Sequence, residues 1–175
     1  MSAEVIESVS VTPIPSSYQK ELGKNAYADN RGTQCLEWVV RARSTSGAEG
    51  ITIANRFIRQ STVAQLLEYL KDALLGRRVD ELLEVSDGVV TGSGPGMEQW
   101  YRHNGWLSIL AFDQLGKVNG VSAIDLLGGK KRDSIPAYDT TLYFQDFLNP
   151  SKGAQQVADE AAQAASDGWK ALKIK

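Results

Sequence analysis

The chain has 175 residues, with 19 lysines and arginines against 21 aspartates and glutamates, and 42% of its residues are hydrophobic. These proportions are typical of a soluble globular protein, and the near-neutral charge excludes a protein that binds nucleic acid by neutralising phosphates. One cysteine, Cys35, excludes a disulfide framework, and with a single histidine, His103, the chain cannot form a Cys/His zinc site. The chain starts without the features of a secretory signal, and no run approaches the roughly 18 apolar residues of a membrane span. We therefore expect a cytoplasmic protein with neither membrane nor nucleic acid as a partner.

Three short β-prone segments come first, at residues 4–11, 36–43 and 51–54. In the second, apolar and polar residues alternate, which is typical of a strand with one buried face. Short strands joined by loops predict an antiparallel meander. Residues 12–33, between the first two segments, are polar and proline-rich, and an unstructured connection of that length is usually a functional lid or disordered.

Helical patterns follow. Residues 63–75 keep leucines at helical spacing, with Ser61 as the predicted N-cap and Gly76 as the stop. Residues 79–85 form a shorter helix candidate.

The glycine-rich loop 92–96 precedes a predicted long helix over residues 97–118. The centre of this helix, WLSILAF, is apolar on nearly all sides, so it should be buried. Within the helix, Asp113 could be a catalytic carboxylate, although a hydrogen-bonded anchor is the simpler interpretation. The next short helix begins at Ser122, its predicted N-cap.

The last part of the chain has a different order of elements. Residues 134–142 are strand-like, residues 154–165 form an alanine-rich helix, and residues 169–175 are strand-like again. A β-α-β order implies parallel strands. The change predicts two domains, residues 1–134 and residues 135–175.

The final strand carries two lysines on one face. With a two-residue period, Lys173 and Lys175 point one way, and Leu172 and Ile174 point the other. Two neighbouring ammonium groups lower each other's pKa, and a lysine with a lowered pKa can act as a general base. Taken alone, the spacing also fits an edge strand protected by charge, or a fraying tail.

Three stretches together resemble the enolase superfamily, in its mandelate racemase and muconate lactonizing enzyme branch. They are AFDQLGK at 111–117, LLGGKKRDSIPAYDTT at 126–141 and GWKALKIK at 168–175. The resemblance implies an α+β capping domain, built of a three-stranded antiparallel meander plus helices. It also implies that the first β-α-β of a (β/α)8 barrel follows, with the barrel incomplete in this chain.

The resemblance also implies a chemistry. Family members abstract the proton α to a carboxylate and hold the resulting enediolate on Mg²⁺. In the matching motif Lys175 would be the base, and Lys173 would lower its pKa and help to bind the carboxylate. A metal suits this chemistry, because an unaided amine is too weak a base for such a proton.

Substrate contacts are implied in two places. By likeness to mandelate racemase, Tyr138 and Thr140 at the end of the first barrel strand are candidates. The long loop between the first two strands would be a lid that closes over the site and sets specificity. Its candidate contacts are Ile14, Tyr18 and Tyr27.

The sequence departs from the family in two segments and in length. GITIANRF at 50–57 stands where the family often has a Gly-x-Gly-Glu-type segment, and NGWLSIL replaces its usual run of small residues. A (β/α)8 barrel takes about 250 residues, whereas residues 134–175 suffice for two strands and a helix. We therefore expect the front of a longer polypeptide, with its Mg²⁺ ligands beyond residue 175, no metal site in this chain and no activity of the chain alone.

Several functions stay open. The leading expectation is an acid-sugar dehydratase or a mandelate-racemase-like enzyme that acts on a small carboxylate as a homo-oligomer. A muconate-type cycloisomerase or an amino-acid or dipeptide epimerase fits the lysine motif equally well. If the chain is truly only 175 residues, a non-catalytic α+β binding module becomes the alternative.

Overall fold

The computed structural model describes four segments of the chain: residues 4–22, 32–54, 62–143 and 153–174. Internal contacts divide the chain into two compact units. The first comprises Met1–Ile14 and Leu36–Lys131, and the second comprises Pro15–Cys35 and Arg132–Lys175. No helix in the described segments is long and apolar enough to cross a membrane.

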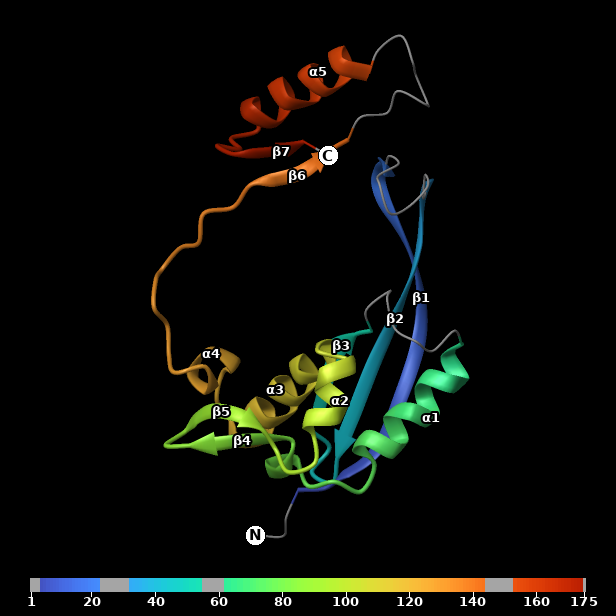
Figure 1. The fold of residues 1–175 in the computed structure, drawn as a ribbon, viewed down its shortest axis with the longest axis vertical. Helices are drawn as coiled ribbons and strands as arrows, with labels where there is room; N and C mark the ends of the chain where they lie inside the picture. The colour runs from blue at the N-terminus through green and yellow to red at the C-terminus, as the bar shows by residue number, and fades with distance from the viewer. Residues whose placement is uncertain (1–3, 23–31, 55–61, 144–152, 175) are drawn as a thin grey trace. The chain divides into compact units, whose positions relative to one another are not determined.

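A three-stranded sheet contains the N-terminal strands in the order β1-β2-β3 (Figure 1). They are β1 (Ile6–Leu22), β2 (Gly32–Ser44) and β3 (Glu49–Ile53). Strands β2 and β3 pair antiparallel, from Val39 opposite Ile53 to Arg43 opposite Glu49. The predicted antiparallel meander is confirmed.

The first strand is longer than the sequence predicted. Strand β1 runs to Leu22 and β2 starts at Gly32, so the predicted loop is wrong for the described parts of residues 12–33. Proline lacks a backbone donor and is tolerated on edge strands, and β1 is an edge strand. Pro13 and Pro15 are two residues apart, so their nitrogens lie on the same side of the strand and need not interrupt the pairing with β2.

Helix α1 (Val63–Leu74) is capped one residue later than expected. Its N-cap is Thr62 and not Ser61, because the Thr62 side chain accepts a hydrogen bond from the Gln65 N–H at 3.2 Å. The helix buries Leu66, Leu70 and Leu74, in keeping with the predicted spacing.

Residues 79–93 form a hairpin in place of the predicted helix. A short 3-10 turn, η1 (Val79–Glu81), leads into β4 (Leu83–Ser86), which pairs antiparallel with β5 (Val89–Ser93). Asp87 and Gly88 join the strands with φ of 52° and 79°. Asp-Gly favours the two-residue hairpin turn that needs positive φ at both positions, and this signal outweighs the weak helical spacing.

The predicted long helix is broken into α2 (Glu98–His103) and α3 (Trp106–Asn119). At the break, the Asn104 amide donates to the Tyr69 hydroxyl at 2.7 Å and accepts from the Trp106 indole N–H at 3.1 Å. Helix α4 (Ala123–Leu126) follows, with Ser122 as the predicted cap.

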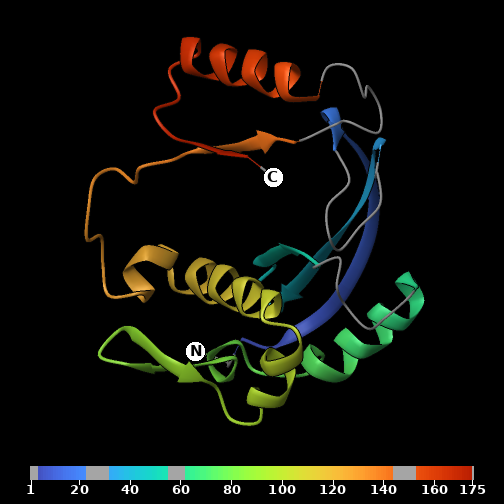
Figure 2. The same ribbon diagram turned by 45° about the horizontal axis from the view of Figure 1, so that its top comes forward.

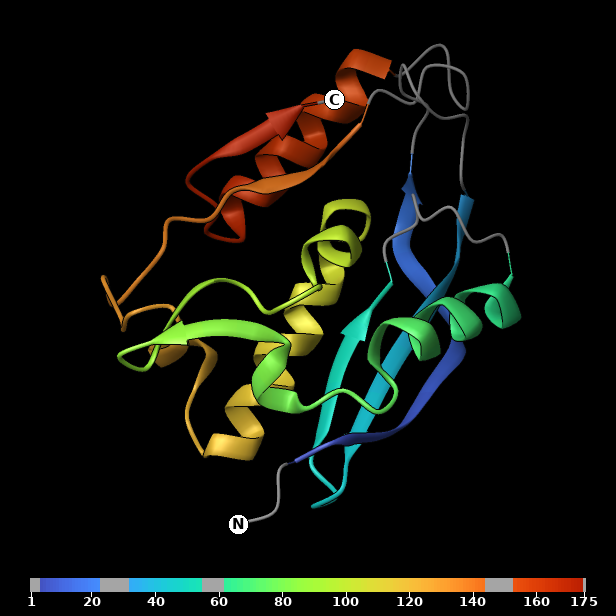
Figure 3. The ribbon, with the colours of Figure 1, turned by 60° about the horizontal axis from the view of Figure 1, so that its bottom comes forward.

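Helix α3 runs alongside β3 in the first unit (Figure 3). It buries Leu107, Leu110 and Ala111, but Ile109 of the same apolar run is 59% exposed, so the helix is buried on one side and not on all sides as predicted. Gly50 permits the close approach, since a Cβ there would lie 2.9 Å from the Leu110 carbonyl oxygen. The core of this unit therefore lies between α3, α1 and the sheet.

The second unit contains the predicted β-α-β. Strand β6 (Asp139–Leu142) and strand β7 (Leu172–Ile174) pair in parallel, with α5 (Gly153–Ser166) between them in the chain. Figure 2 shows α5 lying along the strand pair. The buried residues Leu142, Val157 and Ala164 form its small apolar interior. Both strands are shorter than predicted.

Candidate functional site

Of the two predicted lysines, the structure describes Lys173. It is the middle residue of β7 and is exposed. In the described part of the chain it makes no hydrogen bond or ion pair. Lys175 lies outside the described residues, so the pairing of the two ammonium groups stays a prediction.

The apolar face of β7 is only partly covered. Leu172 keeps 36% of its surface exposed and Ile174 keeps 53%. Strand β7 also has only one neighbour among the described strands, because the sheet consists of β6 and β7. Among the described strands, β7 therefore leaves one edge without a paired strand.

The predicted contact Thr140 lies on β6, the strand that pairs with the strand of Lys173. Asp139 pairs with Leu172 and Leu142 pairs with Ile174, and the register shifts between them. Tyr138 comes just before β6 and is 51% exposed. Thr140 is half-buried.

Two further polar residues of β6 were not singled out from the sequence. The Asp139 Oδ1 accepts hydrogen bonds from the Thr141 backbone N–H at 2.8 Å and from the Thr141 hydroxyl at 2.7 Å. The available signal was the Asp-x-Thr spacing, in which an aspartate bonds the backbone two residues later.

The predicted lid residues lie on a different element. Ile14 is 41% exposed on β1, and Tyr18 is half-buried on the same strand. Tyr27 lies outside the described residues. The contact of these three residues with a substrate stays a prediction.

No metal site is formed by the described residues. Among them there is no group of three or more histidine, cysteine, aspartate or glutamate side chains that could hold a metal ion. The described residues therefore do not fit a Mg²⁺ ion by themselves.

Asp113 is a structural anchor in the first unit, as the simpler interpretation predicted. Its Oδ2 accepts from the Ile51 N–H at 2.8 Å and from the Lys117 ammonium at 2.8 Å. Lys117 also donates to the Glu49 carbonyl at 2.7 Å. These bonds satisfy backbone groups of edge strand β3 that would otherwise be open to another strand.

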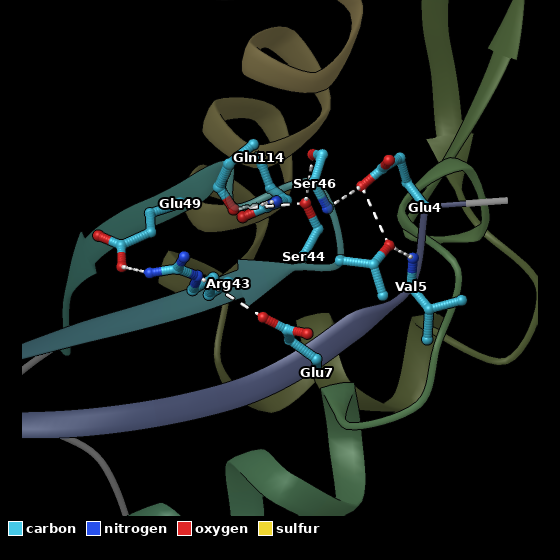
Figure 4. Close-up of polar contacts among 10 residues, drawn as sticks. Glu4, Val5, Glu7, Arg43, Ser44, Ser46, Glu49 and Gln114 are labelled. Carbon is cyan, nitrogen blue, oxygen red and sulfur yellow. Dashed lines mark hydrogen bonds and ion pairs between the residues drawn. The ribbon is translucent and has the colours of Figure 1, made fainter. Parts of the chain in front are cut away.

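A second set of polar contacts ties the start of the chain to the β2–β3 turn (Figure 4). The Glu4 carboxylate accepts from the Ser46 N–H at 3.0 Å and from the Thr45 hydroxyl at 3.3 Å. Hydrogen bonds from Ser46 hold the pKa of Glu4 below its usual value. Arg43 lies between Glu7, at 3.6 Å, and Glu49, at 3.9 Å. All of these groups have structural partners, so they define no ligand site.

A shallow hollow of about 290 Å³ lies in the first unit. Phe112, Val121 and Ser122 line it together with Asp113 and Lys117, which already bond each other and β3. The polar side chains that line this hollow already have partners, so the hollow gives little support to a function as a binding module.

The fold of the chain, an antiparallel three-stranded sheet packed with helices and followed by a parallel β-α-β, is found in solved structures. A mandelate racemase/muconate lactonizing protein from Geobacillus sp. Y412MC10, complexed with magnesium and tartrate, matches with a TM-score of 0.69 and 24% identity. The match covers 100% of this chain and 42% of that one.

Two other solved structures differ in the reactions that they are named for. Galacturonate dehydratase from Geobacillus sp., complexed with D-galacturonate and 5-keto-4-deoxy-D-galacturonate, matches with a TM-score of 0.67 and 24% identity over 100% of this chain and 42% of that one. A muconate cycloisomerase from Azorhizobium caulinodans matches with a TM-score of 0.61 and 18% identity over 99% and 42%. No family model and no curated protein matches the chain.

The resemblance to mandelate racemase/muconate lactonizing enzyme-like members of the enolase superfamily is thus confirmed at the level of the fold. The chain spans about two fifths of the length of the solved structures that it matches.

Proposed function

We propose that residues 1–134 form the capping domain, and residues 135–175 the start of the (β/α)8 barrel, of an enzyme that abstracts the proton α to a carboxylate. The substrate that we favour is an acid sugar or a mandelate-like hydroxy acid. The observation that carries the proposal is the parallel β6-α5-β7 unit with Lys173 exposed on its second strand, within a chain that matches these enzymes over its whole length.

Lys175 is the proposed base, and Lys173 is its neighbour on the same strand face. An ammonium beside the base favours the neutral amine and attracts the substrate carboxylate. Tyr138 and Thr140 are proposed to contact the substrate from the adjacent strand β6. Ile14 and Tyr18 are proposed to contact it from strand β1, and Tyr27 from the segment between β1 and β2.

Magnesium is the proposed cofactor. Two of the matched structures, the Geobacillus protein with tartrate and an enolase from Bradyrhizobium with mandelic acid, contain magnesium. A bound Mg²⁺ stabilises negative charge that develops on a carboxylate. Its ligands are proposed to come from residues other than those described here. A homo-oligomer and a cytoplasmic location stay expectations.

The test is exchange of the substrate α-proton with deuterated solvent, followed by NMR in the complete protein that carries this chain. D-galacturonate, tartrate and mandelate are the first substrates to try. Lys175→Ala should lower the exchange rate by about 10²–10⁴-fold, the usual loss on removing a general base. Lys173→Ala should mainly raise KM. Lys71→Ala is the matched control, because it removes a partly exposed lysine of α1 that pairs with Glu68.

Two outcomes would contradict the proposal. Exchange that survives unchanged in Lys175→Ala would exclude this lysine as the base. No exchange with any acid, with or without magnesium, would favour the non-catalytic binding module.

A muconate-type cycloisomerase is the second candidate. The matched muconate cycloisomerase supports it, because its fold covers nearly the whole chain. Muconate lactone formation by the complete protein, without exchange of hydroxy-acid protons, would favour this candidate.

A further inference from the structure

The segment that joins the two units, residues 130–138, has neither helix nor strand. It lies between α4 and β6 (Figure 1), and the boundary between the units falls inside it, between Lys131 and Arg132. All nine of its residues are exposed. Exposed segments with little structure of their own are where domain boundaries fall and where proteases cut native proteins. Residues 130–138, named here the connecting segment, therefore have the accessibility that a protease requires.

The connecting segment begins with three basic residues, Lys130, Lys131 and Arg132. Of these, Lys131 and Arg132 have no hydrogen bond or ion pair with another described residue. A trypsin-like protease binds a lysine or arginine side chain in a pocket that holds a carboxylate. The connecting segment thus offers such a protease basic side chains that are not engaged elsewhere in the described part of the chain.

The other described lysines and arginines lie in helices, in strands or in short turns. Lys71 is in α1, and Lys117 is in α3. Lys170 is exposed in the turn before β7, but that turn is tied to α5, because the Trp169 N–H donates to the Ala164 carbonyl at 3.0 Å. A protease reaches a helix or strand only through local unfolding, so its rate of cleavage there depends on a small open population.

We propose that the connecting segment is a cleavage site for a trypsin-like protease, which cuts after Lys130, Lys131 or Arg132. Hydrolysis breaks the C–N bond of the peptide, with the hydroxyl of water going to the carbonyl carbon and a proton to the departing amine. The cut severs the chain between α4 and β6. The inference does not depend on the proposed function, because accessibility and charge carry it.

The test is limited proteolysis of the complete protein with trypsin, followed over time by mass spectrometry. The first products should end at residues 130–132, and this cut should be at least about tenfold faster than the next, because cuts in helices and strands need local unfolding. A triple variant, Lys130→Gln, Lys131→Gln and Arg132→Gln, should lose the first cut. Lys170→Gln is the matched control and should leave the order of the cuts unchanged.

A second protease measures accessibility separately from charge. Ile135 is 80% exposed. Thermolysin, which cuts before large apolar residues, should cut the Ser134–Ile135 bond first in the wild type and in the triple variant.

Three results would overturn the inference. One is a first trypsin cut outside the connecting segment. Another is resistance of the connecting segment to both proteases in the complete protein. The third is loss of the thermolysin cut in the triple variant, because the exposure of the segment would then depend on its charges. None of these results bears on exchange of a substrate α-proton, so the proposed function stands or fails separately.

Discussion

Gln114→Leu should destabilise the first unit through the backbone of β3. The Gln114 side chain is fully buried, and its Oε1 accepts from the Gly50 N–H while its Nε2 donates to the Ala48 carbonyl at 3.0 Å. Leucine has a similar size but can do neither. A buried donor without a partner costs about 1–3 kcal/mol, and the half-buried carbonyl adds about 0.5–1 kcal/mol. We expect a loss of about 2–3 kcal/mol, a large part of the stability of a small domain.

The matched control changes the preceding residue of α3. Asp113→Asn keeps an acceptor for the Ile51 N–H and loses the ion pair with Lys117, which is partly exposed. Such pairs contribute about 0–1 kcal/mol. Urea unfolding followed by tryptophan fluorescence gives both free energies by linear extrapolation. A free energy of unfolding of Gln114→Leu within about 0.5 kcal/mol of the wild-type value would contradict this prediction. A loss of the same size in Asp113→Asn would contradict it as well.

Two more predictions concern local geometry and pH. Gly94→Ala should lower the free energy of unfolding by about 2 kcal/mol or more, because a Cβ there would lie 1.9 Å from the Glu81 carbonyl oxygen. Gly105→Ala is the control and should be tolerated, because its Cβ would meet its nearest atom at 3.9 Å. Equal melting temperatures of the two variants would contradict this prediction. Hydrogen bonds from the Ser122 side chain and backbone hold the pKa of Asp125 below its usual value. The stabilisation is present above the ordinary aspartate pKa of about 3.9 and is lost as the pH falls through the lower folded-state value. Asp125→Asn should therefore lower the melting temperature at neutral pH, and the difference should shrink in acid; a difference that grew there would refute the assignment.

Local signals in the sequence predicted several features correctly. Ser122 and Asp125 form a capping box within four consecutive residues, so α4 needs little outside its own segment. The apolar run around Leu110 predicted that this helix packs against the core, without indicating which strand or helix covers it. The order of strand, alanine-rich helix and strand predicted parallel pairing.

Other local signals led to wrong predictions, because two signals in the same segment favoured different structures. The Asp87-Gly88 turn identifies the β4–β5 hairpin, but the apolar spacing of residues 79–85 suggested a helix. Pro13 and Pro15 suggested a loop, because a proline is compatible with a strand only at the edge of a sheet, and the place of β1 in the sheet is not a local property.

The sequence by itself determined the antiparallel meander, the buried helix, the β-α-β order and the two lysines at its end, because each depends on residues close together in the chain. Only the tertiary structure decided which side chains bond the backbone of β3 and how β6 pairs with β7. Asp113 and Gln114 bond residues more than 60 positions earlier, and the extra residue in β6 is defined by pairing with β7 about 30 positions later. Periodicity carries no information on such distant pairs, because they depend on how helices and strands pack and not on the order of neighbouring residues.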